Sequence, residues 1–444
     1  MPLKTGSIEH VSHGAALFSR SGPVAMSSAL PYNPAPARAA RPPLQPLDLA
    51  LAELLAFAVP VAPAESVSTF DADGRVLAQD MVSGLDVPAH DNSSMDGYAV
   101  RCADWTHPDT LLQVNQRIPA GSTGHLLAPA SAARIFTGAP IPPGADAVMM
   151  QEDCDADAAG VRIRVQPGRG QWIRRRGEDV AAGQIVLRAG ERLSPASLGL
   201  AASIGFDRLL VAPRLRVALF STGDELVMPG DVVPADMKPG AIYNSNRFFL
   251  KALLQRLGCT VTDLGIVPDR LEATMDALKA ASRHHDLILT SGGVSVGEED
   301  HIKPAVKALG QLNLWQIAMK PGKPFACGKI GAAHFIGLPG NPVSSFVTFL
   351  LLVRPFILRL LGATEVAPES MAIRADFDWV KADKRREFLR VRMNATGMLS
   401  LFENQSSGVL TSVVWGDGLV DNPAGQTIAR GDTVRFLPFS ALLT

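Results

Sequence analysis

The sequence predicts an α/β multidomain protein in which a central doubly wound parallel sheet is joined to a β-rich N-terminal module and a small C-terminal β-barrel or sandwich. Three observations support this fold class. The chain has 444 residues, of which 47% are hydrophobic, so it is long enough for several cores. Strand-like and helix-like segments alternate between residues 214 and 365, which is the pattern of a parallel sheet with crossover helices. The flanking segments are mostly short β-like runs.

The N-terminal part divides at changes in composition. Residues 1–44 are rich in alanine and proline, so we expect a disordered tail, and it lacks the apolar segment of a targeting peptide. Leucines at helical spacing open the N-terminal region, which we expect over residues 45–213. Runs broken by glycine and proline indicate an inserted β-rich subdomain at about residues 91–165. A second helix is expected over residues 194–204, where Ser-Pro suits an N-cap and a first-turn proline.

The central α/β domain is expected over residues 214–365. We expect strands at 216–220, 260–267, 286–290 and 333–337, and helices at 246–257, 272–281 and from Pro342 onward. The most apolar stretch, residues 346–361, contains two arginines and a proline, so it predicts a buried helix and no membrane span. The alternating segments beyond it indicate a C-terminal β domain over residues 366–444.

Charge and cysteine content narrow the functional classes. The 42 basic and 43 acidic residues leave a formal net charge of −1, which gives no global attraction to nucleic acid or a membrane surface. An anionic ligand must therefore be held locally. The cysteines form neither a disulfide framework nor a zinc-binding spacing, which favours the reducing cytoplasm. They are Cys102, Cys154, Cys259 and Cys327.

Four loops of the central domain are candidates for a binding site. Ligands of an open parallel sheet bind beyond the carboxyl ends of the strands, where loops and helix N-termini converge. Each of the four loops carries glycine, serine, proline or carboxylate residues there. The candidates are Ser221, Gly223, Asp224 and Glu225 in the first loop, Asp269 in the second, Ser291, Gly292, Gly293, Ser295 and Asp300 in the third, and Pro339 and Pro342 in the fourth.

The third loop predicts a site for phosphate with a metal. The backbone N–H groups of Ser291-Gly292-Gly293 are unhindered and can form an anion nest, although the same run also suits a tight turn. The acidic run that ends at Asp300 favours the ligand site, because Mg²⁺ is usually bound by one or two carboxylates together with phosphate and water.

A second candidate is the segment from Lys320 to Pro324, which holds two lysines between prolines. Ammonium groups suit phosphate or another oxyanion, but taken alone the segment is more readily an exposed turn with solvated lysines. The sequence contains no G-x-x-x-x-G-K-[ST] phosphate loop, no G-x-S-x-G nucleophile elbow and no H-E-x-x-H helix.

Seven strings in a fixed order resemble the molybdopterin molybdenumtransferase family, whose eukaryotic relatives include the E domain of gephyrin. The resemblance covers about residues 45–444. Each string is weak alone, but the ordered set is highly specific. The strings are DNSSMDGYAVR (91–101), TGAPIPPGADAVMMQE (137–152), RRRGEDV (174–180), STGDEL (221–226), TSGGVSVGEED (290–300), MKPGKPF (319–325) and GLPGNPVSS (337–345).

The resemblance implies a Mg²⁺-dependent reaction in which adenylyl-molybdopterin and molybdate give molybdenum cofactor and AMP, on a molybdopterin-binding-like central domain. It gives catalytic roles to Asp96, Thr137, Asp179, Glu225, Asp300 and Lys320. It assigns Asp269 and Asp300 to the metal, and Ser221, Gly223, Asp224, Ser291, Gly292, Gly293, Ser295, Pro339 and Pro342 to substrate binding. It implies that Lys320, Lys323, Ser344 and Arg385 hold molybdate. One departure is Lys384, which stands where a glycine often precedes Arg-x-Glu-Phe.

The resemblance also implies partners. It implies a homodimer in which residues 91–101 of one subunit lie near the sheet crevice of the other. It suggests molybdopterin adenylyltransferase and molybdoenzyme chaperones as further partners. Molybdate and tungstate are not distinguished, because both are tetrahedral dianions of nearly equal size.

Two alternatives remain. The first is a different enzyme on the same middle domain, a molybdopterin adenylyltransferase or a nucleotide amidohydrolase, although neither needs the N-terminal and C-terminal modules. The second is a non-catalytic scaffold, against which the presence of Asp300, Lys320 and Lys323 argues.

Overall fold

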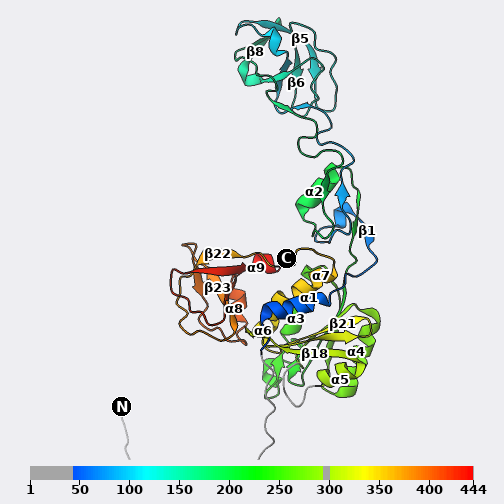
Figure 1. The fold of residues 1–444 in the computed structure, drawn as a ribbon, viewed down its shortest axis with the longest axis vertical. Coiled ribbons are helices and arrows are strands. Elements are labelled where there is room, and N and C mark those ends of the chain that lie inside the picture. Colours follow the sequence, from blue (N-terminus) through cyan, green and yellow to red (C-terminus); the bar gives the residue numbers. More distant parts are fainter. Residues whose placement is uncertain (1–43, 294–300, 444) are drawn as a thin grey trace, which may run out of the picture. The chain divides into compact units, whose positions relative to one another are not determined.

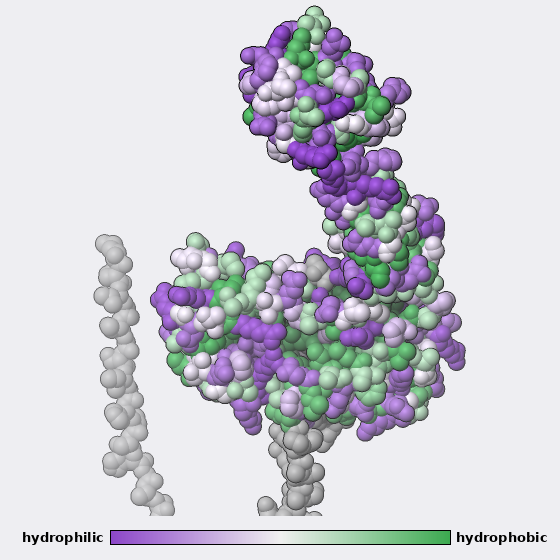
Figure 2. Space-filling view, turned by 45° about the horizontal axis from the view of Figure 1, so that its top comes forward, coloured by the Kyte–Doolittle hydropathy of each residue, from purple (hydrophilic) through white to green (hydrophobic). Residues whose placement is uncertain are grey.

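The computed structural model describes residues 44–293 and 301–443 (Figure 1). The predicted tail, apart from Leu44, lies outside the described residues, and so do Ser295 and Asp300 of the third loop. On the face shown in Figure 2, hydrophilic and hydrophobic side chains are mixed.

The central sheet has six strands in the order β16-β13-β17-β21-β20-β18. Their bounds are β13 Arg216–Thr222, β16 Thr260–Val267, β17 Leu287–Ser291, β18 Gly310–Gln316, β20 Pro324–Ile330 and β21 Ala333–Leu338. The first four strands in the sheet order are parallel, as predicted, whereas β20 runs antiparallel to both of its neighbours. The two-residue turn Gly331-Ala332 explains this hairpin, because a parallel connection needs a much longer crossover.

Helices cover both faces of this sheet, which confirms the doubly wound prediction (Figure 1). Successive residues of β13 point to opposite faces: Leu219 packs in one core cluster and Phe220 in another. The Leu219 cluster includes residues of α1 Leu47–Ala56, α3 Asn246–Arg256, α6 Pro342–Thr348 and α7 Arg354–Leu360. The Phe220 cluster includes residues of α4 Leu271–His284 and α5 Ile302–Leu309.

The apolar stretch near residue 350 forms one helical run, Pro342–Leu360, with a π-helical turn at Phe349–Val353 between α6 and α7. Within the described residues this run alone has the length and composition of a membrane span, but 94% of it is buried inside the protein. Helices of protein cores pass the same test, so the prediction of a buried helix is confirmed.

The N-terminal region is built from short elements around three small clusters of buried hydrophobic residues. The strand β1 Glu65–Ser68 pairs with β12 Arg208–Val211, and β2 Met81–Val82 pairs with β11 Ile185–Leu187. Helix α2 Pro195–Ser203 begins with the predicted cap: the Ser194 hydroxyl accepts a hydrogen bond from the Ser197 N–H, and the reciprocal bond completes a capping box.

A six-stranded sheet with the order β7-β4-β6-β5-β9-β8 forms the β-rich module of this region. The bounds are β4 Gly97–Val100, β5 Leu111–Ile118, β6 Ser131–Ile135, β7 Ala147–Met150, β8 Cys154–Asp157 and β9 Gly160–Ile163. Beside it, β3 Asn92–Ser93 pairs with β10 Ile173–Arg174. Residues far apart in the chain are thereby placed together at the start of β4.

The C-terminal sheet has the order β19-β23-β25-β26-β22, with β24 on β23. Its strands are β19 Met319–Lys320, β22 Met371–Arg374, β23 Arg386–Met393, β24 Leu399–Leu401, β25 Gly418–Asn422 and β26 Thr433–Pro438, and short helices lie at α8 Thr411–Trp415 and α9 Phe439–Leu442. The strand β19 precedes the central strand β20 in the chain, yet it pairs in parallel with β23. The lysine-containing segment thus belongs to the C-terminal sheet by hydrogen bonding.

Candidate active site

The carboxyl ends of the central strands bring three predicted loops into a row. Ser221 at the end of β13 is in register with Ser291 at the end of β17, which is in register with Leu338 at the end of β21. Both serines are buried. The loops that follow these strands therefore start side by side, as the sheet rule predicts.

The Gly292-Gly293 turn after β17 is packed tightly against the end of β13. Both glycines have left-handed φ angles, +94° and +69°. A Cβ on Gly292 would lie 2.8 Å from the Thr222 carbonyl oxygen, and a Cβ on Gly293 would lie 2.5 Å from Ile302 Cγ1. Only glycine fits both the conformation and the space. The Gly292 N–H donates to the Leu338 carbonyl (3.1 Å), so this donor of the predicted anion nest is already used.

One residue that the sequence reasoning missed connects two of these loops. Asn246, buried in the first turn of α3, donates from Nδ2 to Ser291 Oγ (2.8 Å) and to the Gly340 carbonyl (2.7 Å). The signal in the sequence is an amide side chain at a helix start within the run Tyr-Asn-Ser-Asn. Asn246 thus holds the third loop against the fourth.

We expect Asn246→Ala to lower the free energy of unfolding by about 1–3 kcal/mol, because the buried Ser291 hydroxyl and the Gly340 carbonyl both lose their donor. Urea denaturation checks this. The matched control is Asn341→Ala, which removes an exposed asparagine from the fourth loop and is expected to change stability by less than about 0.5 kcal/mol. Equal effects of the two substitutions would contradict the role assigned to Asn246.

Carboxylates gather at the ends of β13 and β16. The Asp269 N–H donates to Asp224 Oδ1 at 3.5 Å, so the first and second loops meet. The Glu225 carboxylate folds over Gly223, where a Cβ would lie 2.5 Å from Glu225 Oε2. Among residues 44–293 and 301–443, no group of three metal-binding side chains occurs. Asp224 and Asp269 can each contribute a carboxylate here, which fits Mg²⁺ when phosphate and water supply the other ligands.

Lys320 lies in a cluster of charges at the edge of the C-terminal sheet. Its Nζ is 2.9 Å from Glu387 Oε1 and 3.5 Å from Asp383 Oδ2, and it lies 5.9 Å from the centre of the Trp379 ring. The Glu387 side chain is 1% exposed, and its second oxygen accepts a hydrogen bond from Trp379 Nε1 (2.7 Å). A buried and fully bonded carboxylate therefore fixes the position of the Lys320 ammonium group.

Arg385 belongs to the same cluster. Its Nε and Nη2 donate to the two oxygens of Asp383 at 3.0 and 2.8 Å, and its backbone N–H donates to Asp383 Oδ1. These hydrogen bonds, with the charges of Arg385 and Lys320, hold the pKa of the Asp383 carboxyl far below its ordinary value. Lys320 and Arg385, both predicted to bind an oxyanion, thus share one carboxylate.

Helix α6 connects this charge cluster to the crevice loops. It starts at Pro342 in the fourth loop, and a Cβ on Gly322 would lie 2.4 Å from the hydroxyl of Thr348 at its other end. Ser344, which is 5% exposed, lies one turn before Thr348 on the same face of the helix. The Lys320–Lys323 segment, Ser344 and the fourth loop are therefore parts of one packed unit.

Three predicted motifs of the N-terminal module also meet. Asp96 accepts hydrogen bonds from the backbone and the hydroxyl of Thr137, both at 2.8 Å, and these bonds lower its pKa. Asp91 accepts from the Arg176 N–H and the Arg175 guanidinium, at 2.8 and 2.6 Å.

These motif residues lie on a different sheet from the crevice loops. Asp96 directly precedes β4 of the six-stranded sheet, and Thr137 follows β6 of the same sheet. The side chain of Asp179 is exposed on the loop after β10.

All four cysteines are free thiols. Burial raises the pKa of Cys102 to about 11 and the pKa of Cys259 to about 12. Burial likewise raises the pKa of Cys154 and of Cys327 to about 12. Cysteine nucleophiles act as thiolates, whereas these thiols stay protonated at neutral pH.

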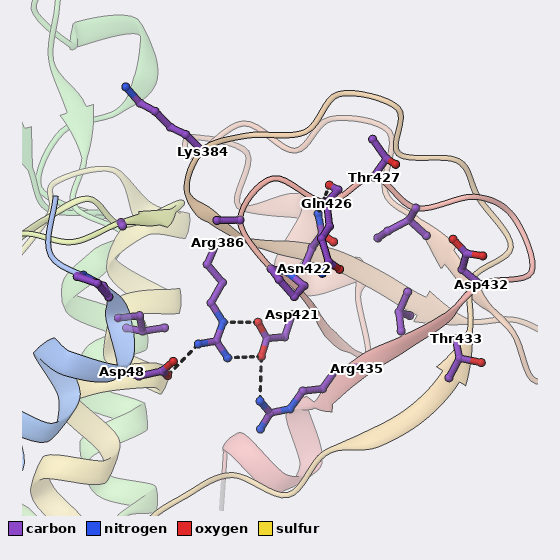
Figure 3. A pocket seen from close by; sticks show the side chains of 17 residues that line it. Asp48, Lys384, Arg386, Asp421, Asn422, Gln426, Thr427, Asp432, Thr433 and Arg435 are labelled. Atoms are coloured by element: carbon purple, nitrogen blue, oxygen red, sulfur yellow. Dashed lines mark hydrogen bonds and ion pairs between the residues drawn. The ribbon is translucent and has the colours of Figure 1, made fainter.

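A cavity of about 850 Å³ lies between the start of α1 and the C-terminal sheet (Figure 3). Arg386 and Arg435 both point at Asp421, and Arg386 also contacts Asp48 at 2.8 Å. Arg386 and Glu387 are consecutive in β23 and so point to opposite faces. The charges of this cavity are thus separate from the Lys320 cluster.

Comparison with known proteins places each part of the chain. The MoeA N-terminal region (domain I and II) matches residues 45–205, a probable molybdopterin binding domain matches residues 218–359, and the MoeA C-terminal region (domain IV) matches residues 372–439.

Individual relatives match over most of their length. A molybdopterin molybdenumtransferase of Haemophilus influenzae is 41% identical over 389 residues, which cover 85% of this chain and 95% of the relative. A molybdopterin molybdenumtransferase 2 of Mycobacterium tuberculosis is 40% identical over 308 residues, covering 67% and 75% of the two chains. The solved structure of the molybdopterin biosynthesis moeA protein from Pyrococcus horikoshii OT3 matches with a TM-score of 0.78 and 27% identity, covering 89% of this chain and all of that chain.

Proposed function

Because this chain belongs to the molybdopterin molybdenumtransferase family, whose members are transferases of molybdenum cofactor biosynthesis, we propose that it converts adenylyl-molybdopterin and molybdate into molybdenum cofactor and AMP. The observation that carries the proposal is the connection made by α6. This helix starts in the fourth crevice loop and ends against the Lys320–Lys323 segment, so one helix joins the crevice loops to the lysines.

One group of residues binds the adenylyl phosphate, and a second group binds molybdate. The Gly292-Gly293 turn, with Ser221, Ser291 and the Pro339–Pro342 loop, forms the crevice that receives the adenylyl phosphate. Lys320 and Arg385, with Lys323 and Ser344, hold molybdate by charge-assisted hydrogen bonds.

Asp224 and Asp269, together with Asp300 outside the described residues, would hold Mg²⁺. When bound, Mg²⁺ neutralises charge that develops on the phosphate oxygens. The fixed positive charges of this chain stabilise the same developing negative charge. This chemistry needs no protein nucleophile, in agreement with the high pKa values of the cysteine thiols.

The direct test is AMP release by the purified full-length chain from adenylyl-molybdopterin, with molybdate or tungstate and with or without Mg²⁺. The proposal predicts release that requires the oxyanion and is stimulated by Mg²⁺. A scaffold would release no AMP, and a molybdopterin adenylyltransferase would consume ATP and molybdopterin to make the substrate. Either result would overturn the proposal.

We further propose a homodimer in which Asp96 serves the crevice of the neighbouring subunit, since Asp96 and Thr137 lie on a sheet separate from the crevice loops. A mixture of inactive Asp96→Asn and Asp300→Asn subunits is then expected to recover activity, because one site of each mixed dimer is intact. AMP release after subunit exchange measures this. Absence of recovery despite demonstrated exchange would assign both residues to one subunit's site.

The proposed reaction and the free thiols are consistent with action in the cytoplasm. A molybdopterin adenylyltransferase that supplies the substrate and molybdoenzyme chaperones that receive the product are the partners that fit this reaction.

A further inference from the structure

Two carboxylates of different character contact the cations that are proposed to hold molybdate. Glu387 is buried, lies within β23 and is fixed from the far side by Trp379 Nε1. Asp383 is 20% exposed and precedes β23. Its side chain accepts hydrogen bonds from Arg385, and Oδ2 lies between the Arg385 Nη2 (2.8 Å) and the Lys320 Nζ (3.5 Å). The position between the two cations is thus occupied by a side-chain oxygen.

An oxyanion held by both cations would have to reach the donors that Asp383 uses. The Asp383 carboxylate occupies the Nε–Nη2 edge of the Arg385 guanidinium, and its Oδ2 also lies 3.5 Å from Lys320 Nζ. An anion that bridges this edge and Lys320 must therefore displace the Asp383 carboxylate. The displacement leaves Lys320 in place, because Glu387 continues to hold it.

We propose that Asp383 is an intramolecular competitor: its carboxylate lies between Lys320 and Arg385, and molybdate must displace it to bind both cations. The inference rests on the proposed function of Lys320 and Arg385. The consequence of this competition is selectivity for charge. A dianion gains more electrostatic free energy from the two cations than the monoanionic carboxylate does, whereas a monoanion of the same shape gains little when it replaces the carboxylate. Asp383 stays ionised at neutral pH, since its pKa is far below its ordinary value, so the competition is always present.

The test is the binding of molybdate and of perrhenate, a tetrahedral monoanion, to the full-length protein by isothermal titration calorimetry. Asp383→Asn is expected to tighten molybdate binding about tenfold, the effect of roughly one charge-assisted hydrogen bond, and to make perrhenate binding measurable. Asp383→Ala serves as a second variant, and circular dichroism checks the fold of both.

The matched control is Asp48→Asn. This substitution removes the negative charge of Asp48, which pairs with Arg386 at the cavity of Figure 3. Arg386 is the next residue after Arg385 in the sequence. The control is expected to leave molybdate affinity unchanged. Unchanged or weaker molybdate binding in both Asp383 variants would overturn the proposal and assign Asp383 the role of positioning Arg385.

Failure of the proposed function gives a different result. If the proposed reaction is wrong, the wild-type protein releases no AMP, and Lys320→Ala does not weaken anion binding. Tighter anion binding by Asp383→Asn without AMP release by any form would support the competitor and refute the reaction.

Discussion

Lys320→Ala is expected to raise the molybdate concentration needed for half-maximal AMP release by about ten- to a hundredfold, because one charge-assisted hydrogen bond to the anion is lost. The Mg²⁺ dependence should remain nearly unchanged, since Lys320 lies with the C-terminal sheet and the Asp224–Asp269 pair at the ends of β13 and β16. Titration of AMP release against each ion measures both effects. In contrast, Asp300→Asn is expected to shift the Mg²⁺ curve.

Removal of Lys320 also leaves the buried Glu387 carboxylate without its cation, which by itself lowers stability. The double variant Lys320→Ala/Glu387→Gln separates the two effects, because a neutral amide replaces the unpaired charge. We expect it to regain stability in urea denaturation without regaining molybdate affinity. A shift of the Mg²⁺ curve alone in Lys320→Ala would contradict the division of the site.

Gly292→Ala is expected to lower kcat/KM for adenylyl-molybdopterin by about a hundredfold, the effect of misplacing a binding loop by about 1 Å. The added Cβ would lie 2.8 Å from the Thr222 carbonyl oxygen. The nearest atom belongs to the backbone of β13 and cannot rotate away as a side chain could, so the turn must move away from β13. Steady-state kinetics with varied adenylyl-molybdopterin measures the loss.

Two glycines provide controls for this substitution. Gly331 has a left-handed φ of +60° in the β20–β21 turn and open space around its Cβ position, so Gly331→Ala adds the backbone strain without the clash. Gly397, in the C-terminal domain, likewise has a left-handed φ of +75° and open space around its Cβ position. Both variants should keep nearly normal kcat/KM. Equal losses in Gly292→Ala and Gly331→Ala would show that backbone strain, and not loop displacement, is responsible.

The sequence predicted those features that depend on local pattern. Hydrophobic runs predicted β13, β16, β17 and β21, and the rule that ligands bind at strand ends selected loops that the register places side by side. The Ser-Pro cap of α2 was predictable because its hydrogen bonds join residues three apart.

Features that depend on distant contacts were not predictable. Asn246 was missed because its acceptors lie 45 and 94 residues away in the chain. The pairing of Lys320 with Glu387 joins residues 67 apart, and neither local sequence indicates the other. The structure adds an ion pair that the sequence did not indicate, since the short strand β19 aligns Lys320 with β23.

Because β19 pairs with β23, the boundary between the last two domains falls at one place along the sequence and at another in the hydrogen-bonded sheets. A chain shortened to end at residue 365 would keep the strands and loops of the crevice but would lose β23, the strand that sets the direction of the lysine. Exchange of C-terminal domains between relatives would likewise exchange Asp383 and Glu387, the carboxylates that contact the Lys320 ammonium group. To keep these contacts, the central domain and the C-terminal sheet have to be exchanged together.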